Sequence, residues 1–203
     1  AYALNLSSRQ LLEQWGLWPG DSAVTPVECI QVWGDDASNI LFPGETQSPL
    51  SWIVDVPALE HALHAHVSSS AQIERVDQPV PAQLTIVCEG RFSATRSQLG
   101  VSRVRRPYGQ VALATRVRAE HPHGAQASQW FNHSGPHCPH ILALLPMGGA
   151  SGHDLAVVWS LPSALSQELT NMSDQSFEEA LQDASHHLFG RLHLTSARTG
   201  WPL

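Results

Sequence analysis

Four short apolar runs follow one another between residues 111 and 159, and each is separated from the next by residues that favour turns. Gly, Pro, Asn and His are frequent in the intervening segments, where they interrupt regular structure. Successive strand-length runs with this punctuation are typical of consecutive antiparallel strands. The chain is therefore predicted to build a largely antiparallel sheet from residues 111–117, 129–131, 141–145 and 155–159.

Two helices are predicted to follow this sheet, at 162–170 and at 174–188. Ser173 or Asp174 would cap the second helix, because a short polar side chain can accept a hydrogen bond from the first free backbone N–H groups. A last strand is predicted from 192–194. The later helix is expected to pack on or beside the sheet, which gives a mixed α/β or α+β fold.

The first part of the chain alternates helical and strand-like patterns. Ser7 and Ser8 are good caps for a short amphipathic helix that Gly16 would end. A hairpin is predicted next, because the turn residues Gly34-Asp35-Asp36 lie between two strand-like runs. A second helix is predicted after Pro57. The two runs of the hairpin are residues 27–33 and 40–42.

A continuous apolar run at residues 84–87 ends in Cys88-Glu89-Gly90. Such a run is typical of a buried strand that enters a loop. Helical residues resume around Ser93.

The charge balance excludes several classes of function. The formal charge is −7, and all 11 basic residues are Arg. A nucleic-acid binder needs a clustered positive surface, which this chain lacks outside Arg103, Arg105 and Arg106. Without Lys, neither a Schiff base nor a phosphate-loop lysine is available. Three Cys form no disulfide framework, and no apolar run approaches the length of about 18 residues that a membrane helix needs.

Two further motifs resemble functional sites but lack a required residue. Residues 149–153 approach the Gly-x-Ser-x-Gly motif of hydrolases, but His153 replaces the second Gly. Histidines are dense between 121 and 140, and Cys138 lies among them, yet no four-ligand zinc set is complete. We expect no metal. His186 and His187 are expected to end the last helix, where a cation interacts favourably with the helix dipole.

Residues 87–96 read Val-Cys-Glu-Gly-Arg-Phe-Ser-Ala-Thr-Arg. This stretch resembles the fingerprint Gly-Ala-Asp-Gly-x-x-Ser-x-x-Arg of FAD-dependent aromatic hydroxylases of the ubiquinone-biosynthesis family, a branch of the para-hydroxybenzoate hydroxylase class. Gly90, Ser93 and Arg96 match, whereas Glu89 replaces Asp and lengthens the carboxylate by one methylene. The resemblance implies that these four residues approach flavin and nicotinamide nucleotide.

Other segments are similar to the same family in the same order. Ala1 to Ser8 and Gly16-Leu17-Trp18 resemble the helix that follows the ribose-binding part of the flavin domain, and Val32 to Asp35 resemble the next hairpin. Residues 108–110, 127–131, 144–146 and 158–161 resemble the sheet that roofs the substrate pocket. The resemblance implies that the substrate is bound by Tyr108, Gln110, Leu145 and Pro146.

The sequence also departs from this family. No Gly-x-Gly-x-x-Gly motif occurs, so the turn that would place a pyrophosphate at a helix N-terminus is missing. We therefore expect an internal piece of a longer enzyme that binds no FAD by itself. The resemblance divides it into remnants of an FAD-binding domain at 1–26, 50–105 and 195–203, and a substrate-binding domain at 27–49 and 106–194.

The resemblance implies a flavin-dependent monooxygenase that hydroxylates a phenolic, polyprenylated or simple, ubiquinone precursor with NAD(P)H and O2. It implies a cytoplasmic location, with peripheral membrane or biosynthetic-complex association left open. The alternative is a non-enzymatic module whose sheet binds an apolar ligand or a protein partner. Cofactor content would distinguish the two.

Overall fold

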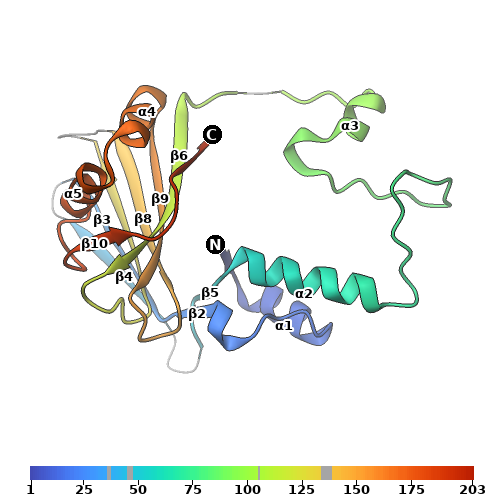
Figure 1. Cartoon of the computed structure of the whole chain (residues 1–203), viewed down its shortest axis with the longest axis horizontal. Helices are drawn as coiled ribbons and strands as arrows, with labels where there is room; N and C mark the ends of the chain where they lie inside the picture. The colour runs from blue at the N-terminus through green and yellow to red at the C-terminus, as the bar shows by residue number, and fades with distance from the viewer. Residues whose placement is uncertain (36–37, 45–47, 105, 134–138) are drawn as a thin grey trace.

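The computed structural model describes the chain except residues 36–37, 45–47, 105 and 134–138. Its largest element is a sheet with the strand order β10-β6-β9-β8-β7-β3-β4, in which β11 also pairs with β6 (Figure 1). The strands are β3 (Cys29–Trp33), β4 (Asn39–Pro43), β6 (Gln110–Ala119), β7 (Gln126–Asn132), β8 (His140–Met147), β9 (Asp154–Pro162), β10 (Leu192–Leu194) and β11 (Thr199–Pro202).

Pairing in this sheet is antiparallel except between β3 and β7, which run parallel. The four predicted apolar runs form β6, β7, β8 and β9 and lie side by side. The predicted hairpin also forms, from β3 and β4. The prediction of a largely antiparallel sheet in a mixed α/β fold is therefore confirmed.

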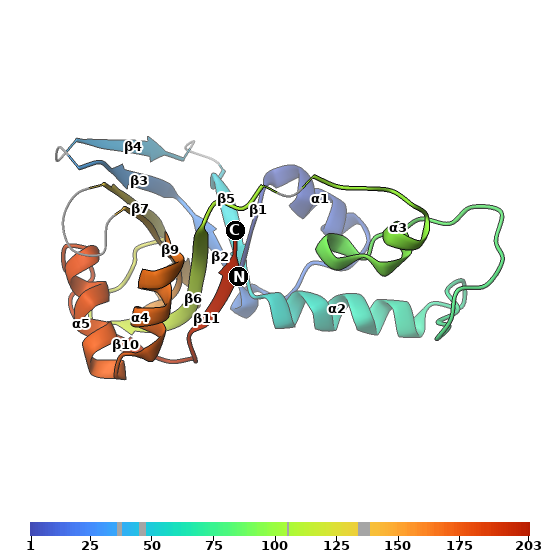
Figure 2. The same ribbon diagram turned by 90° about the horizontal axis from the view of Figure 1, so that it is seen from above.

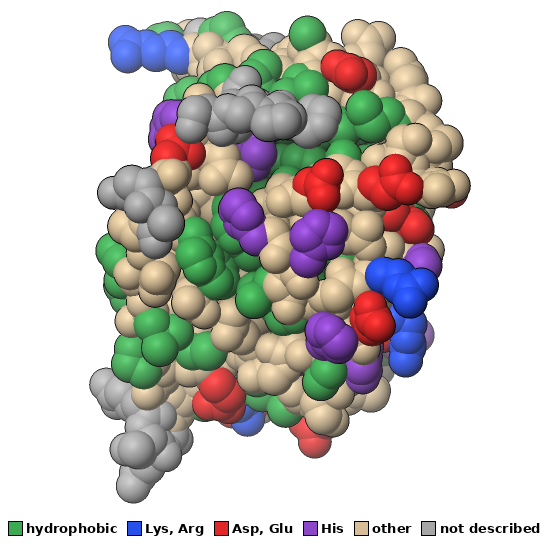
Figure 3. Space-filling model, turned by 90° about the vertical axis from the view of Figure 1, so that its left-hand side faces the viewer, with side chains coloured by type: hydrophobic (Ala, Val, Ile, Leu, Met, Phe, Trp, Pro, Cys, Tyr) green, Lys and Arg blue, Asp and Glu red, His purple; other side chains and the backbone are tan. Residues whose placement is uncertain are grey.

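Two helices, α4 (Ser163–Asn171) and α5 (Asp174–Ala184), pack on one face of the large sheet. Phe177 of α5 lies against Trp159 of β9, with ring centroids 6.0 Å apart. Leu169 and Leu181 are fully buried beside them, and burial of such side chains stabilises a fold by about 1.5–3 kcal/mol each. On the outer side of this layer, histidine and acidic side chains lie among neutral and hydrophobic ones (Figure 3).

The last helix is shorter than predicted. α5 ends at Ala184, and His186 and His187 follow it in the left-handed region, with φ of 51° and 53°. The expectation that these two histidines form the end of the helix is therefore wrong. Their backbone instead forms a turn in which Gly190 donates to the carbonyl of His187. The N-terminal cap is as predicted, because Ser173 accepts from the N–H of Ser176.

A second, three-stranded sheet has the order β1-β5-β2, formed by β1 (Tyr2–Leu4), β2 (Val24–Val27) and β5 (Ser51–Val54). Helices α1 (Leu6–Gln14) and α2 (Val56–Ser69) accompany it, and a short 3-10 turn, η1 (Asp21–Ala23), precedes β2. Asn5, and not Ser7 or Ser8, caps α1, since the Asn5 side chain accepts from the N–H of Ser8. The small core holds Val24, Trp52, Val54 and Leu59.

A long connection leads from α2 to β6 and extends away from both sheets (Figure 2). Its regular structure consists of η2 (Gly90–Phe92) and α3 (Ala94–Gln98). The buried strand predicted at 84–87 is absent, and Leu84 and Ile86 are each 75% exposed. An apolar strand is buried only when neighbouring strands pair with it, and no described strand reaches this segment.

The domain division predicted from the sequence remains a prediction. The structure adds one fact to it: β11, at the end of the chain, pairs with residues 111–114 of β6 in the large sheet.

Candidate functional site

The face of the large sheet opposite α4 and α5 is covered only in part. At one end the small sheet packs on it, where Ile53 meets Ala127, Met147 and Ala156. No described helix covers the rest of this face, which looks toward the side where both chain ends lie (Figure 1). We call this uncovered region the open face. Each strand contributes every second residue to this face, because successive side chains of a strand point to opposite sides of the sheet.

The strand register arranges the open face in rows. One row runs from β7 to β11 and consists of Gln129, Ala143, Val158, Ala114 and Thr199. The neighbouring row consists of Phe131, Ile141, Ser160, Ala112 and Trp201. Directly paired residues in such rows lie about 4.5–5.5 Å apart.

Small side chains gather at the centre of the open face. Ala112, Ala114 and Ala143 are each half-buried and occupy adjacent rows. Phe131 and Ile141 carry larger side chains beside them in the second row. Because the alanine side chains are shorter than those of Phe131 and Ile141, an apolar surface of this kind suits the flat face of an aromatic ring.

Two polar side chains interrupt this apolar surface. Gln129 and Ser160 are half-buried and face the same side as the alanines. In the described part of the chain, neither side chain makes a hydrogen bond with another residue. A half-buried amide or hydroxyl group without a protein partner is available to a ligand, because such groups are ordinarily paired.

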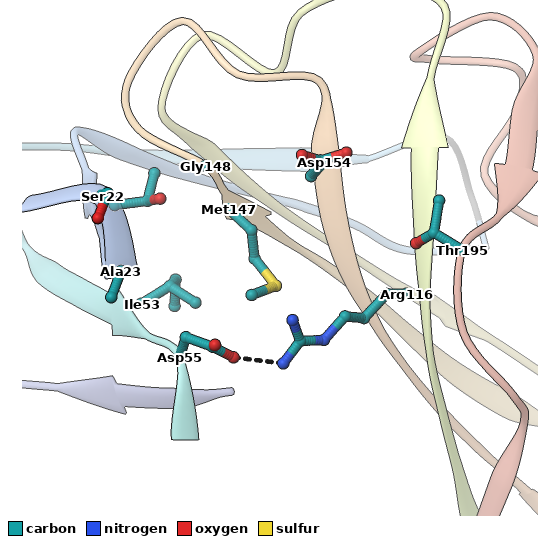
Figure 4. Close-up of a pocket in the computed structure, with 10 residues that line it drawn as sticks. Ser22, Ala23, Ile53, Asp55, Arg116, Met147, Gly148, Asp154 and Thr195 are labelled. Carbon is teal, nitrogen blue, oxygen red and sulfur yellow. Dashed lines mark hydrogen bonds and ion pairs between the residues drawn. The ribbon is translucent and has the colours of Figure 1, made fainter. Parts of the chain in front are cut away.

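Charged groups lie at the end of the open face next to the small sheet. A hollow there is lined by Arg116, Asp55 and Asp154 together with Met147 and Thr195 (Figure 4). Arg116 of β6 forms an ion pair with Asp55, and the dashed line in Figure 4 marks this contact between the two sheets. The open face therefore changes from apolar at its centre to charged at this end.

The structure divides the four predicted substrate residues. Gln110 lies on the same side of β6 as Ala112, and Leu145 lies on the same side of the sheet, beside the residues that the small sheet covers. Pro146 is buried on the opposite face, and Tyr108 is 80% exposed ahead of β6. Gln110 and Leu145 thus share one face without meeting. The substrate roles of all four residues stay predictions.

The four predicted cofactor residues do come together. The Ser93 hydroxyl donates to the Glu89 carboxylate at 2.8 Å and accepts from the Arg96 N–H at 3.0 Å. The Thr95 hydroxyl and N–H also donate to Glu89, and these bonds, the hydroxyl first, hold the pKa of Glu89 below its usual range. Gly90 has a φ of +69°, which favours glycine.

Arginines surround this loop. Arg91, Arg96 and Arg103 line one hollow together with Ser93 and Gly100. Arg96 donates to the carbonyls of Gly90 and Arg91, at 3.4 and 3.1 Å. Planar guanidinium groups bind phosphate well, so the hollow fits one anionic part of a dinucleotide cofactor. The loop itself is exposed, and the described chain offers no second wall there.

Among the described residues, no group of three His, Cys, Asp or Glu side chains is placed to hold a metal ion. His137 and Cys138 lie outside the described residues. His123 is buried, where Met147 and Ala125 use both of its ring nitrogens.

The sequence did not predict a role for Gln129, Ser160 and the alanines of the open face. A signal was present, because Ala112 and Ala114 alternate with Leu113 and Thr115 along β6. Small residues at every second position put short side chains on one face of a strand, where another molecule can come close to the sheet.

The fold is that of part of the FAD-dependent monooxygenases and flavin-dependent halogenases. The structure of PqsL from Pseudomonas aeruginosa, described as a probable FAD-dependent monooxygenase, is similar to the whole chain with a TM-score of 0.77 and 17% identity, over 63% of PqsL. PqsL has also been solved in complex with 2-aminobenzoylacetate. The flavin-dependent brominase Bmp2 matches 98% of the chain with a TM-score of 0.65 and 12% identity, over 56% of Bmp2.

Among curated proteins, the uncharacterized protein slr1300 of Synechocystis is 22% identical over 231 residues. This match covers the whole chain and 54% of slr1300, so the chain spans about half the length of this relative. No protein-family model matches. In the described residues, no helix has the length and apolar character needed to cross a membrane.

Proposed function

We propose that this chain forms the substrate-facing part of an FAD-dependent aromatic monooxygenase. The observation that carries the proposal is the open face, with alanines at its centre and two unpaired polar groups, in a fold shared with flavin-dependent enzymes. An apolar wall with few polar groups is the usual form of a pocket for an aromatic ligand.

The residues would have separate roles in binding the substrate and the cofactor. Ala112, Ala114 and Ala143 accommodate the ring and exclude water from one side of it. Gln129 and Ser160 orient the ring by hydrogen bonds to its hydroxyl or carbonyl substituents. Bound FAD would supply the activation of oxygen, which protein side chains cannot provide. Arg91, Arg96 and Arg103 would hold an anionic part of a nucleotide.

The finer assignment follows the sequence resemblance. The substrate would be a phenolic precursor of ubiquinone, and NAD(P)H would reduce the flavin. A neutral, apolar substrate agrees with the centre of the open face, where the two middle rows contain no charged residue. Tyr108, Gln110 and Leu145 remain the proposed neighbours of the substrate at the rim, whereas the predicted role of Pro146 would have to act from the opposite face.

The experiment adds a bulky side chain among the alanines of the open face. In the complete enzyme, Ala143→Phe places a ring where the substrate ring would lie, and Ala150→Phe, on the exposed turn between β8 and β9, is the matched control. We expect Ala143→Phe to lower hydroxylation of a test phenol about 100-fold with flavin content retained, and Ala150→Phe to leave it unchanged. Equal hydroxylation by both variants would refute the assignment of the open face.

The non-enzymatic alternative makes a different prediction. A binding module would bind an apolar phenol through the open face without consuming NAD(P)H or oxygen. Complete protein that binds the phenol, loses this binding in Ala143→Phe and contains no flavin would favour that alternative.

A further inference from the structure

Trp201 of β11 extends the open face beyond the alanines. It pairs with Ala112 of β6, and Ala112 pairs in turn with Ser160 of β9, so these side chains follow one another on the same side of the sheet. The Trp201 side chain is 60% exposed, whereas Trp130 and Trp159 on the opposite face are fully buried. Trp201 is therefore available to a molecule that lies on the open face.

The spacing of the strands leaves room for one ring beside Trp201. Neighbouring strands lie about 4.8 Å apart, so the Cα atoms of Trp201 and Ser160, on either side of Ala112, are separated by roughly 10 Å. Aromatic rings that pack on each other have centroids about 4.5–7 Å apart. A planar ring above the short Ala112 side chain therefore contacts the Trp201 indole and stays within reach of the Ser160 hydroxyl.

β11 is fixed at both ends by side chains from distant parts of the fold. Just before it, the Arg198 guanidinium donates to the Leu169 carbonyl at 2.9 Å and to the Asp174 carboxylate at 2.8 Å. At its other end, Arg91 donates to the Pro202 carbonyl at 2.6 Å. A side chain on a strand that is already ordered loses less conformational entropy when a ligand binds.

Arg91 also lines the hollow that we assign to an anionic part of the cofactor. Its bond to the Pro202 carbonyl therefore connects that hollow to β11, which borders the alanines of the open face. A substrate ring held beside Trp201 would lie at the edge of the open face that is connected to the cofactor hollow.

We propose that Trp201 selects planar ligands on the open face by stacking on the aromatic ring of the substrate. The inference rests on the proposed function and adds to it a residue that separates aromatic substrates from saturated ones of the same size. Contact with the alanines does not distinguish the two, because the gain from burying apolar surface depends on its area. Contact with the indole does, because the interaction between aromatic rings adds to their burial.

A matched pair of probes tests this selection in the complete enzyme. β-Naphthol is planar, and decahydro-β-naphthol has the same carbon skeleton and hydroxyl group without aromatic rings. By calorimetry without NAD(P)H, we expect Trp201→Leu to raise the dissociation constant of β-naphthol about five- to tenfold and that of the saturated probe less than about twofold. Trp201→Phe should restore most of the affinity for β-naphthol. Trp15→Leu, which replaces an exposed tryptophan at the end of α1, is the control and should change neither constant.

The results separate this inference from the proposed function. Ala143→Phe should abolish binding of both probes, because it occupies the open face itself. If it does so while Trp201→Leu binds the two probes in the native ratio, the open face is the binding site but Trp201 does not select planar ligands, and the inference is overturned. Binding of neither probe by the native enzyme would contradict the proposed function as well.

Ala112→Ile is a second test that leaves Trp201 in place. The larger side chain fills the space beside the indole and should raise the dissociation constant of β-naphthol at least about tenfold. Native affinity in Ala112→Ile would show that the ring binds away from Trp201, and would also overturn the inference.

Discussion

Arg116 of β6 forms an ion pair with Asp55, which lies at the N-terminal end of α2, although 61 positions separate the two residues in sequence. The contact joins the large sheet to the small one beside the hollow at the charged end of the open face. The side chains are 39% and 26% exposed, so water screens their attraction.

We expect Asp55→Asn to lower the free energy of unfolding by about 0.5–1 kcal/mol, because a partly exposed ion pair contributes no more than this. Urea unfolding of Asp55→Asn, Arg116→Gln and the double variant gives the coupling energy of the pair. Strictly additive losses would contradict a direct interaction. Arg118→Gln, which removes the more exposed pair with Asp154, is the control with a smaller expected effect.

His123 should make stability depend on pH. Its Nδ1 accepts from the Ala125 N–H at 3.1 Å and its Nε2 lies 2.8 Å from the Met147 carbonyl, so the neutral ring satisfies both contacts. Burial lowers the pKa of His123 below its usual range, although the bond to Met147 opposes this shift. The unfolded chain therefore binds a proton at a higher pH than the folded chain.

The direction of the pH dependence follows from the linkage between protonation and folding. The contribution of His123 is fully present above its unfolded pKa of about 6.5 and is lost as the pH falls from there toward the lower folded pKa. We expect the native chain to lose more stability between about pH 7.5 and pH 5.5 than His123→Gln, measured by urea unfolding. His64→Gln, at an exposed position of α2, is the control and should keep the native slope. Identical slopes for native and His123→Gln would contradict the prediction.

Apolar runs predicted the central strands of the large sheet, whereas the small sheet of β1, β2 and β5 was not predicted although its strands are paired. β8 and β9 each pair on both sides, so their apolar runs alone locate them. Residues 84–87 carry an equally apolar pattern but have no described strand beside them, and they are exposed. Apolar periodicity indicates what a segment can bury, whereas burial also requires a partner.

The candidate site was less predictable than the fold. Leu145 and Pro146 are adjacent in sequence, yet alternation along β8 puts them on opposite faces. Gln129 becomes a candidate only when the register shows it in one row with Ala143, Val158 and Ala114. Such rows join residues from separate strands, and sequence order does not reveal them.

Gln129→Leu tests the polar groups of the open face in the complete enzyme. The change would leave a hydrogen-bonding group of the substrate unpaired, at a cost of about 1–3 kcal/mol, so kcat/KM for a phenol should fall roughly ten- to a hundred-fold. Gln175→Leu, on the exposed side of α5, is the control. Unchanged kcat/KM in Gln129→Leu would remove Gln129 from the site.

The chain by itself is expected to bind no FAD. It contains no Gly-x-Gly-x-x-Gly turn, and its arginine-lined hollow lies on an exposed loop. Purified protein should lack flavin absorbance, and added FAD should keep the fluorescence of free flavin. A yellow preparation with stoichiometric flavin would show that residues 1–203 suffice for binding.

Arg96 has two alternative roles that a single substitution separates. Its guanidinium donates to the Gly90 and Arg91 carbonyls, and the Glu89 carboxylate accepts instead from Ser93 and Thr95. Arg96 is thus not held by a carboxylate, and its remaining N–H groups are available to a phosphate. Loss of one charge-assisted contact costs about 1.5–3 kcal/mol.

We therefore expect Arg96→Ala in the complete enzyme to weaken binding of FAD or NAD(P)H roughly ten- to a hundred-fold. Arg96→Lys should recover part of this affinity, since it keeps the charge without the planar fork. Arg75→Ala, at an exposed position of the long connection, is the control and should bind both nucleotides normally. The measurement is a titration of each nucleotide against each variant. Unchanged dissociation constants in Arg96→Ala, together with a lower melting temperature, would instead assign Arg96 the structural role of bracing the loop through the Gly90 and Arg91 carbonyls.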